Sequence, residues 1–300
     1  MNRLKINKKN NWLTYILVLL GVFIFVLVYS SMSAPSGNVP IINIDGLIQF
    51  SSGDMFSTSS SFIEEKIYDL ADDPNVEGMI LRINSPGGTP VASNRISNAV
   101  EYFSNQNKTV VSVIDEMGAS GAYLIASASD KIFLDEMSIV GSIGVKSSRL
   151  SLEGLLRDYN ISYYSMSSGD YKDFGDVLVE PTDEELEAMK GISEDLHTKF
   201  SNIVMENRNI SKNFAEENNL FSGLIFLGSD AIEYDLVDSI GGMKEAEDYL
   251  YNDLNQTLLT YPVRRDRGFF ESAYGFTKNI ISEDYLNLNL RSPFLFVFDR

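Results

Sequence analysis

Ser120 is the side chain whose surroundings most favour chemistry. It lies among small residues in the stretch 117–123, MGASGAY. A serine becomes a nucleophile when a nearby base takes its proton. The chain has no cysteine and a single histidine, His197, so the base must be that histidine, a carboxylate or a lysine. The lack of cysteine also excludes disulfides, thiolate metal sites and a cysteine nucleophile.

His197 is a weak candidate for this base. It lies in a charged stretch, SEDLHTK at 193–199, where a single histidine is usually a solvated surface residue. The pattern around Ser120 also departs from the nucleophile elbow of hydrolases, because Ala122 replaces the last glycine of that motif. A histidine-based triad is therefore disfavoured, and lysine is the next base to consider.

Lys172, in SSGDYKDF at 167–174, is the lysine that could serve. Free lysine has a pKa near 10.4, so a base at neutral pH needs that pKa lowered by about three units, or roughly 4 kcal/mol. Burial among apolar and hydroxyl groups can lower it, and Ser142 in GSIGV at 141–145 could hold the neutral amine. The carboxylates of Asp170 and Asp173 would raise the pKa of Lys172, so they must point away from its amine.

Backbone amides are the third element of a possible site. The run NSPGG at 84–88 breaks a short apolar strand and leaves amide groups without side chains to shield them. Together with the amide of Gly121 at a helix start, such donors can form an oxyanion hole. Taken alone, this run is more simply read as an ordinary turn.

The elements that must position these residues alternate between strand and helix. Apolar runs predict strands at 38–50, 78–83, 109–114 and 131–134. Helices are expected at 62–70, 91–103, 122–128, 181–207 and 230–237, with a cap at 182–185. Such alternation predicts an α/β fold of right-handed βαβ units around a parallel sheet.

The N-terminal segment predicts a membrane anchor. Residues 12–32 carry no charge, and about twenty such residues span a bilayer as a helix. All charged residues before this segment are basic: Arg3, Lys5, Lys8 and Lys9. The positive-inside rule then places 1–11 in the cytoplasm and the rest of the chain outside. A cleaved signal peptide ending near 31–34 is the alternative, but the apolar stretch is long for one.

Composition limits the partners of the remainder. The chain of 300 residues has 42 acidic and 24 basic residues, a net charge of −18, which argues against nucleic acid as a partner. After the anchor we expect a linker at 33–37, a catalytic domain at 38–253 and a tail at 254–300. The tail has three arginines and several aromatic residues that suit either a lipid surface or packing against protein, of which we favour packing: Arg264, Arg265, Arg267, Phe269, Phe270, Tyr274 and Phe276.

Several motifs occur together in one order. They are LRINSPGG at 81–88, GASGAY at 118–123, GSIGV at 141–145 and SGDYKD at 168–173. Over about residues 38–250 the chain resembles the bacterial signal peptide peptidase family of the SppA type. Ala122 and Thr89 stand where that family often has glycine, and neither change removes a reacting side chain.

The resemblance implies a ClpP/crotonase-like spiral and a Ser–Lys dyad without metal or cofactor. The matching positions are Ser120 as nucleophile, Lys172 as base, Ser142 orienting the lysine, and Gly87, Gly88 and Gly121 as oxyanion donors. It further implies a ring-like homo-oligomer on the cytoplasmic membrane with its catalytic domain outside. Its substrates would be remnant signal peptides or other apolar peptides.

Other functions stay open. A related protease could cut one specific membrane protein in a regulatory role. A non-catalytic scaffold of the same fold could bind apolar peptides without hydrolysing them. A crotonase-type acyl-CoA enzyme is disfavoured, because a site outside the cytoplasm would meet no CoA.

Overall fold

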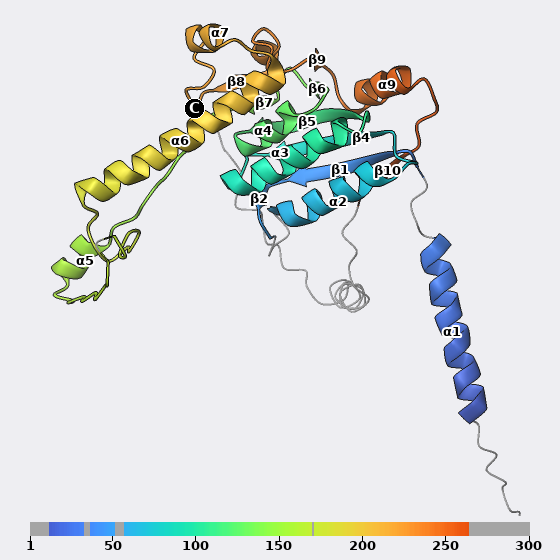
Figure 1. Cartoon of the computed structure of the whole chain (residues 1–300), viewed down its shortest axis with the longest axis horizontal. Coiled ribbons are helices and arrows are strands. Elements are labelled where there is room, and N and C mark those ends of the chain that lie inside the picture. The colour runs from blue at the N-terminus through green and yellow to red at the C-terminus, as the bar shows by residue number, and fades with distance from the viewer. Residues whose placement is uncertain (1–11, 33–36, 52–56, 170, 264–300) are drawn as a thin grey trace, which may run out of the picture. The chain divides into compact units, whose positions relative to one another are not determined.

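The computed structural model describes residues 12–32, 37–51, 57–169 and 171–263. The sheet and the helices that pack on it belong to a compact unit that ends at Val263 (Figure 1). The aromatic and arginine residues of the predicted tail lie outside the described residues, as does Asp170.

A mostly parallel sheet forms the centre of this unit. Its order is β10 (Thr260–Pro262), β1 (Val39–Asp45), β4 (Gly78–Ser85), β5 (Thr109–Ala119), β6 (Lys131–Leu134) and β9 (Ser239–Ile240). β7 (Ile139–Gly141) pairs in parallel with the end of β5, and β8 (Ile225–Leu227) pairs antiparallel with β7. β2 (Leu47–Gln49) and β3 (Ser57–Ser59) form a separate parallel pair. The sheet therefore extends to β10, past the predicted domain limit at 253.

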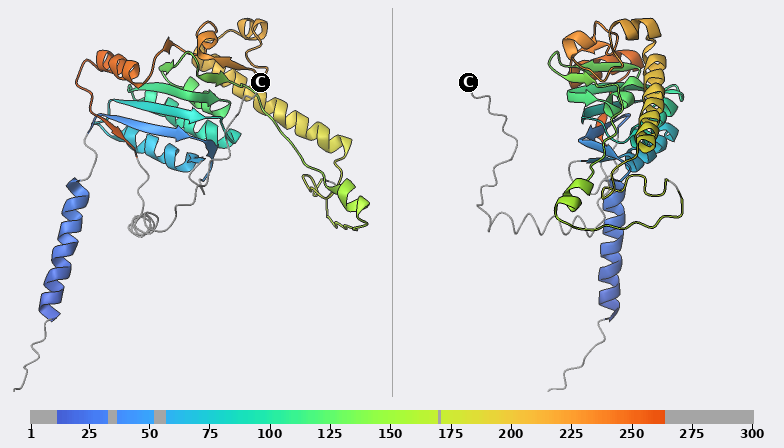
Figure 2. Two further views of the ribbon diagram at one scale, coloured as in Figure 1. Left: turned by 180° about the vertical axis from the view of Figure 1, so that it is seen from behind. Right: turned by 90° about the vertical axis from the view of Figure 1, so that its left-hand side faces the viewer.

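Helices cover both faces of the sheet (Figure 2). One face carries α2 (Ser60–Asp72), α3 (Pro90–Ser104) and α4 (Gly121–Ser127), and the other carries α9 (Met243–Leu254). α6 (Asp183–Arg208) contacts α4. The shorter helices are α5 (Glu153–Asp158), α7 (Lys212–Glu217) and α8 (Gly228–Ala231).

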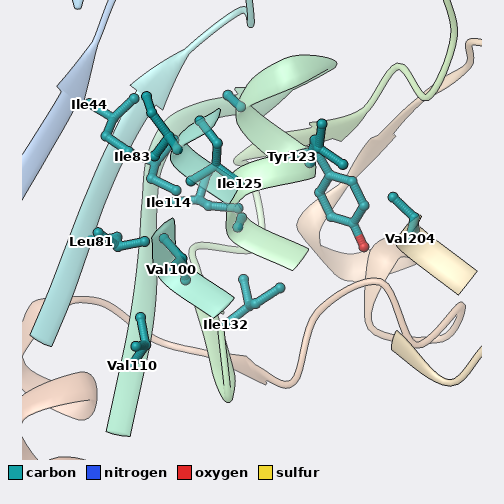
Figure 3. Close-up of a cluster of buried hydrophobic side chains, with 14 of the residues drawn as sticks. Ile44, Leu81, Ile83, Val100, Val110, Ile114, Tyr123, Ile125, Ile132 and Val204 are labelled. Atoms are coloured by element: carbon teal, nitrogen blue, oxygen red, sulfur yellow. The ribbon is translucent and has the colours of Figure 1, made fainter. Parts of the chain in front are cut away.

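The core explains why the central strands are read correctly from sequence. Leu81 and Ile83 of β4 and Ile114 of β5 are buried against Val100 of α3 and Ile125 of α4 (Figure 3). Parallel strands covered on both faces are apolar along their whole length, and each such side chain contributes about 1.5–3 kcal/mol. The predicted mixed α/β fold is confirmed, and the predicted strand at 131–134 has the observed bounds.

Two helix predictions had different outcomes. The cap expected at 182–185 is a capping box, in which Thr182 and Glu185 each bind the other's backbone amide at 3.2 and 3.0 Å. The helix predicted at 230–237 is wrong, because α8 ends at Ala231. Asp235 has a φ of 58°, a left-handed conformation that a right-handed helix cannot continue through.

Residues 12–32 form a helix, α1 (Trp12–Met32), as predicted. Within the part of the chain that the structure describes, no helix has both the length and the hydropathy of a membrane span. The structure therefore does not support the predicted transmembrane anchor.

Candidate active site

Ser120 occupies a strained junction between a strand and a helix. It follows β5 directly and is the N-cap residue of α4, with φ 54° and ψ −125°. Its amide donates to the Gly141 carbonyl at 2.8 Å, and its carbonyl accepts from the Leu124 amide at 3.0 Å. A non-glycine residue in such a conformation costs about 1–3 kcal/mol, and such strain is concentrated at functional sites.

Ser142 lies beside Ser120 because of the β5–β7 ladder. Ala119 pairs with Gly141, so the residue after each strand end is a serine. Gly141 and Ser142 both have positive φ, 89° and 52°, and the Ser142 amide donates to the Leu224 carbonyl at 2.6 Å. The structure thus brings together two of the residues that the sequence singles out.

Two glycines of the loop after β4 are packed tightly, one of them against Ser120. Gly87 has a φ of 101°, and a Cβ atom there would lie 2.8 Å from the Gly121 amide nitrogen and 2.9 Å from Ser120 Cβ. A Cβ on Gly88 would lie 1.9 Å from the Ile48 carbonyl oxygen. Because backbone atoms set these limits, only glycine lets the loop after β4 approach the serine this closely.

The amides of these glycines are not equivalent. The Gly87 amide already donates to Ser85 Oγ at 3.1 Å, and Ser85 Oγ donates to the Gly46 carbonyl at 2.6 Å. The amides of Gly88 and Gly121 have no acceptor among the described residues. The structure therefore leaves Gly88 and Gly121 as the available donors of the predicted oxyanion set, with Gly87 giving the loop its shape.

A cavity of about 970 Å³ opens beside Ser120, and Gly87, Gly88 and Gly121 share its wall. Most of its remaining lining is apolar and comes from β2, α3, α4 and α6: Leu47, Ile48, Val91, Leu124, Leu196, Phe200 and Ile203. Ligand sites are typically apolar hollows with a few polar groups, and this cavity has that character.

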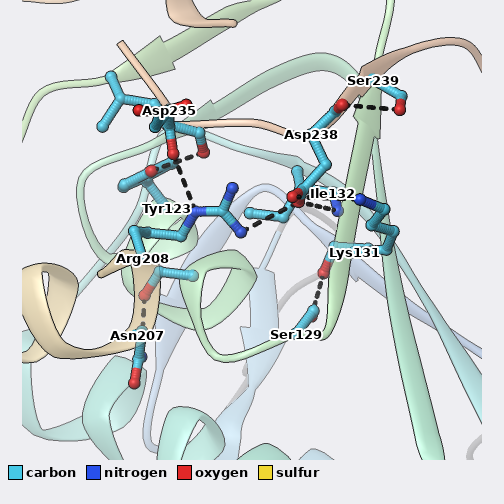
Figure 4. Close-up of polar contacts among 12 residues, drawn as sticks. Tyr123, Ser129, Lys131, Ile132, Asn207, Arg208, Asp235, Asp238 and Ser239 are labelled. Atoms are coloured by element: carbon cyan, nitrogen blue, oxygen red, sulfur yellow. Dashed lines mark hydrogen bonds and ion pairs between the residues drawn. The ribbon is translucent and has the colours of Figure 1, made fainter. Parts of the chain in front are cut away.

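Helix α4 is fixed from behind by polar contacts (Figure 4). The Tyr123 hydroxyl donates to the Leu236 carbonyl at 2.7 Å, and burial raises the pKa of Tyr123 above its ordinary value. Beside it, Arg208 binds Asp238 at 3.0 Å, and Asp238 accepts from the Ile132 amide at 2.8 Å. The Tyr123 bond fastens the helix that begins at Ser120 to the segment before β9, and the Asp238 contacts hold that segment against α6 and β6.

Lys172 lies apart from this arrangement. It belongs to residues 146–181, hereafter the arm, and its side chain is exposed and does not line the Ser120 cavity. Its neighbour Asp173 accepts a hydrogen bond from Ser165 at 2.9 Å. The described part of one chain therefore does not bring Lys172 to Ser120, and the predicted dyad stays a prediction.

Two lysines that sequence reasoning missed do line the cavity, Lys146 and Lys199, and both are exposed. A signal for Lys199 existed, since it lies on α6 between Leu196 and Ile203, which face the cavity. His197 does not line the cavity, but it is half-buried, and its Nε2 atom is buried without a partner among the described residues. The expectation of a fully solvated histidine was wrong.

Comparison with known proteins gives the family context. The model of peptidase family S49 matches residues 102–257, which is more than half of the chain and includes Ser120, Ser142 and Lys172. A protein of Methanocaldococcus jannaschii named as a protease is 32% identical over 209 residues, covering 69% of this chain and 66% of that protein. A protein of Enterococcus faecium named as signal peptide peptidase SppA is 32% identical and covers 63% and 54%.

Haemophilus influenzae Protease 4 is 30% identical over 227 residues, covering 73% of this chain and 36% of its own length. The chain thus spans about a third to two thirds of these relatives. Two solved structures, the membrane-bound stomatin-specific protease 1510-N and Listeria monocytogenes ClpP1, match with a TM-score of 0.45 at 13% and 15% identity. They cover 78% and 68% of this chain, and 100% and 92% of their own. Scores this low carry no argument, so the ClpP/crotonase-like spiral stays a prediction.

Proposed function

Because the chain belongs to peptidase family S49, we propose that it is a serine endopeptidase with Ser120 as its nucleophile. The observation that carries the proposal is the strained Ser120 backbone at a cavity wall, next to the unused amides of Gly88 and Gly121. In this mechanism Ser120 Oγ bonds to the peptide carbonyl carbon, and the carbonyl electron pair moves to oxygen. While the base takes the Ser120 hydroxyl proton, the two amides stabilise that oxyanion. Its collapse breaks the peptide C–N bond, the base gives the proton to the leaving amine, and water then hydrolyses the acyl-serine ester.

The proposed base is Lys172, supplied by a second copy of the chain. The arm bearing it exposes many large apolar side chains: Leu150, Leu155, Tyr159, Ile161, Tyr163, Tyr164, Met166, Tyr171, Phe174 and Val177. An apolar surface of this kind marks an interaction site. Seated on a neighbouring copy, the arm would lose solvent around Lys172, and burial is what a lysine base requires. In a homo-oligomeric ring, the arm of each copy would dock on the next copy, so every apolar arm surface would be covered.

The substrates we propose are apolar peptides, remnant signal peptides among them. Aliphatic and aromatic side chains make up most of the cavity lining beside Ser120, so they favour apolar residues next to the cleaved bond. We further propose that α1 anchors the enzyme in the cytoplasmic membrane with the catalytic domain outside. Every described side chain of α1 is exposed, and its apolar surface needs lipid or protein to cover it.

Mixing inactive variants tests the proposal. The full chain in detergent is assayed on an apolar fluorogenic peptide, first as Ser120→Ala and Lys172→Ala separately. Each variant should lose more than about a thousandfold in kcat, since each removes one half of the reacting pair. Co-refolded together, the two should regain about a quarter of wild-type activity, because some pairs combine an intact serine with an intact lysine.

Lys146→Ala and Lys199→Ala are the matched controls, since both lysines line the cavity and both variants should keep activity. Retained activity in Ser120→Ala would refute the peptidase proposal. Loss in Lys146→Ala or Lys199→Ala, with Lys172→Ala active, would move the base to the cavity lysine. Peptide binding without hydrolysis by the wild type would favour a non-catalytic scaffold.

A further inference from the structure

Ser93 is a buried hydroxyl at the catalytic cavity that the mechanism above leaves unused. It lies in the second turn of α3, its side chain is fully buried, and it lines the same cavity as Ser120. Its Oγ atom has no hydrogen-bond partner among the described residues. A buried polar group without a partner costs about 1–3 kcal/mol, so its presence calls for an explanation.

The position of Ser93 Oγ relative to the free amides suggests one. A Cβ atom built on Gly121 would lie 2.1 Å from Ser93 Oγ and 3.4 Å from the Gly88 amide nitrogen. The hydroxyl therefore lies against the Gly121 backbone on the side where the Gly88 amide also approaches. Three unpaired hydrogen-bond donors, two amides and one hydroxyl, meet within one short stretch of cavity wall.

The next serine on α3 shows that the helix does not leave hydroxyls unpaired by default. Ser97, one turn later and also buried, donates to the Leu124 carbonyl at 3.4 Å. Ser93 has its own amide bound to the Thr89 carbonyl at 3.1 Å, so only its hydroxyl is unsatisfied. The first turn of α3 begins at Pro90, so the positive end of a fifteen-residue helix also lies near this hydroxyl.

We propose that Ser93 is a catalytic residue whose hydroxyl donates a third hydrogen bond to the oxyanion, beside the amides of Gly88 and Gly121. This inference rests on the proposed peptidase function. As the Ser120 Oγ–carbon bond forms and the carbonyl electron pair moves to oxygen, the Ser93 O–H rotates toward that oxygen and gains the acceptor it lacks in the free enzyme. A bond made only when the oxyanion forms accelerates the reaction without tightening substrate binding.

The test exploits opposite effects on activity and stability. Ser93→Ala keeps the small side chain but removes the hydroxyl. In the full chain it should lower kcat by about a hundred- to a thousandfold with little change in KM, as loss of an oxyanion donor does. It should weaken binding of a peptide aldehyde, which forms an oxyanion on Ser120, by the same factor. Its Tm should stay equal or rise, because an unsatisfied buried hydroxyl is removed.

Ser60→Ala is the matched control. Ser60 is equally buried and its Oγ is also unpaired among the described residues, but it does not line the cavity. It should show the same Tm behaviour with unchanged kcat.

Unchanged kcat and aldehyde affinity in Ser93→Ala would overturn the inference, as would a clear fall in Tm, which would make the hydroxyl structural. In both cases the proposed peptidase function still holds, provided that Ser120→Ala abolishes the activity of the wild type. If Ser120→Ala retains activity, the peptidase proposal itself fails, and that result is distinct from the first two.

Discussion

The surroundings of Ser120 and the arm that bears Lys172 are built on opposite principles. Around Ser120, glycine backbones approach to the limit that atoms allow, and the supporting strands and helices are buried. The arm exposes most of its large apolar side chains and contains one short helix, α5, with no buried residue. One chain therefore preorganises Ser120 and the amides of Gly88 and Gly121, whereas Lys172 lies on an exposed apolar surface.

The largest expected effect comes from crowding the glycine loop. In Gly88→Ala the new methyl group would collide with the Ile48 carbonyl, a backbone atom that cannot move aside. We expect kcat to fall below about 1% of wild type and stability to fall by about 3 kcal/mol in urea titrations. Gly191→Ala on the exposed side of α6, where nothing lies within 4 Å of the new methyl, is the matched control and should lower neither. Near-normal activity in Gly88→Ala would show that the tight approach is dispensable.

Truncating an apolar side chain in each region should separate folding from assembly. Leu81→Ala in the buried sheet should cost about 2–5 kcal/mol of unfolding free energy. Tyr164→Ala in the arm, where the side chain is 83% exposed, should leave that free energy within about 0.5 kcal/mol. Sedimentation should nevertheless show the Tyr164→Ala oligomer dissociating at higher protein concentration. An unchanged oligomer would mean that the arm's apolar surface is not the interface.

The smallest effect concerns a carboxylate on β1, close to the loop that shapes the site. Partial burial, with the nearby charge of Asp115, raises the pKa of Asp45 above its ordinary value of 3.8, although Arg82 opposes this. The folded state then holds the Asp45 proton more tightly than the unfolded state, so ionisation costs stability as pH rises through and above 3.8.

Asp45→Asn should therefore raise Tm by one to two degrees at about pH 7, and the gain should vanish near pH 3. Thermal melts across this range measure it, with Glu187→Gln as the control, since Glu187 is an exposed carboxylate on α6 that has no ion pair among the described residues. A gain that is the same at both pH values would exclude ionisation of Asp45 as the cause.

The sequence predicts the buried elements well because burial on both faces leaves a continuous apolar run. The strand at 131–134 and the cap at Thr182 follow from such local signals. The antiparallel strand β8 was missed, since Ile225–Leu227 is only three residues long and is recognised by pairing with β7. Pairing between strands that are distant in the sequence has no local signature. The partner of each strand and the register of the pair are therefore seen only in the folded structure.

The site was predictable by residue type but not by role. The Pro-Gly-Gly run indicates a loop whose backbone can pack closely against another segment. The hydrogen bond from the Gly87 amide to Ser85 Oγ, however, depends on tertiary geometry that the sequence does not show. The same holds for Ser93, which resembles any small residue on the buried side of a helix. Lys172 shows the limit most clearly: its motif singles it out, but the described part of one chain leaves its side chain exposed and outside the Ser120 cavity.

The Tyr123 phenol has a consequence for the conditions under which such an enzyme works. A lysine takes protons only as a free amine, a form that alkaline medium enriches. At the same alkaline pH an ordinary tyrosine would lose its phenolic proton. Its hydroxyl would then change from a hydrogen-bond donor into an anion facing the Leu236 carbonyl. Deep burial favours the protonated phenol, so the hydrogen bond from Tyr123 to the Leu236 carbonyl persists to higher pH than an ordinary tyrosine would allow, which suits the proposed lysine base.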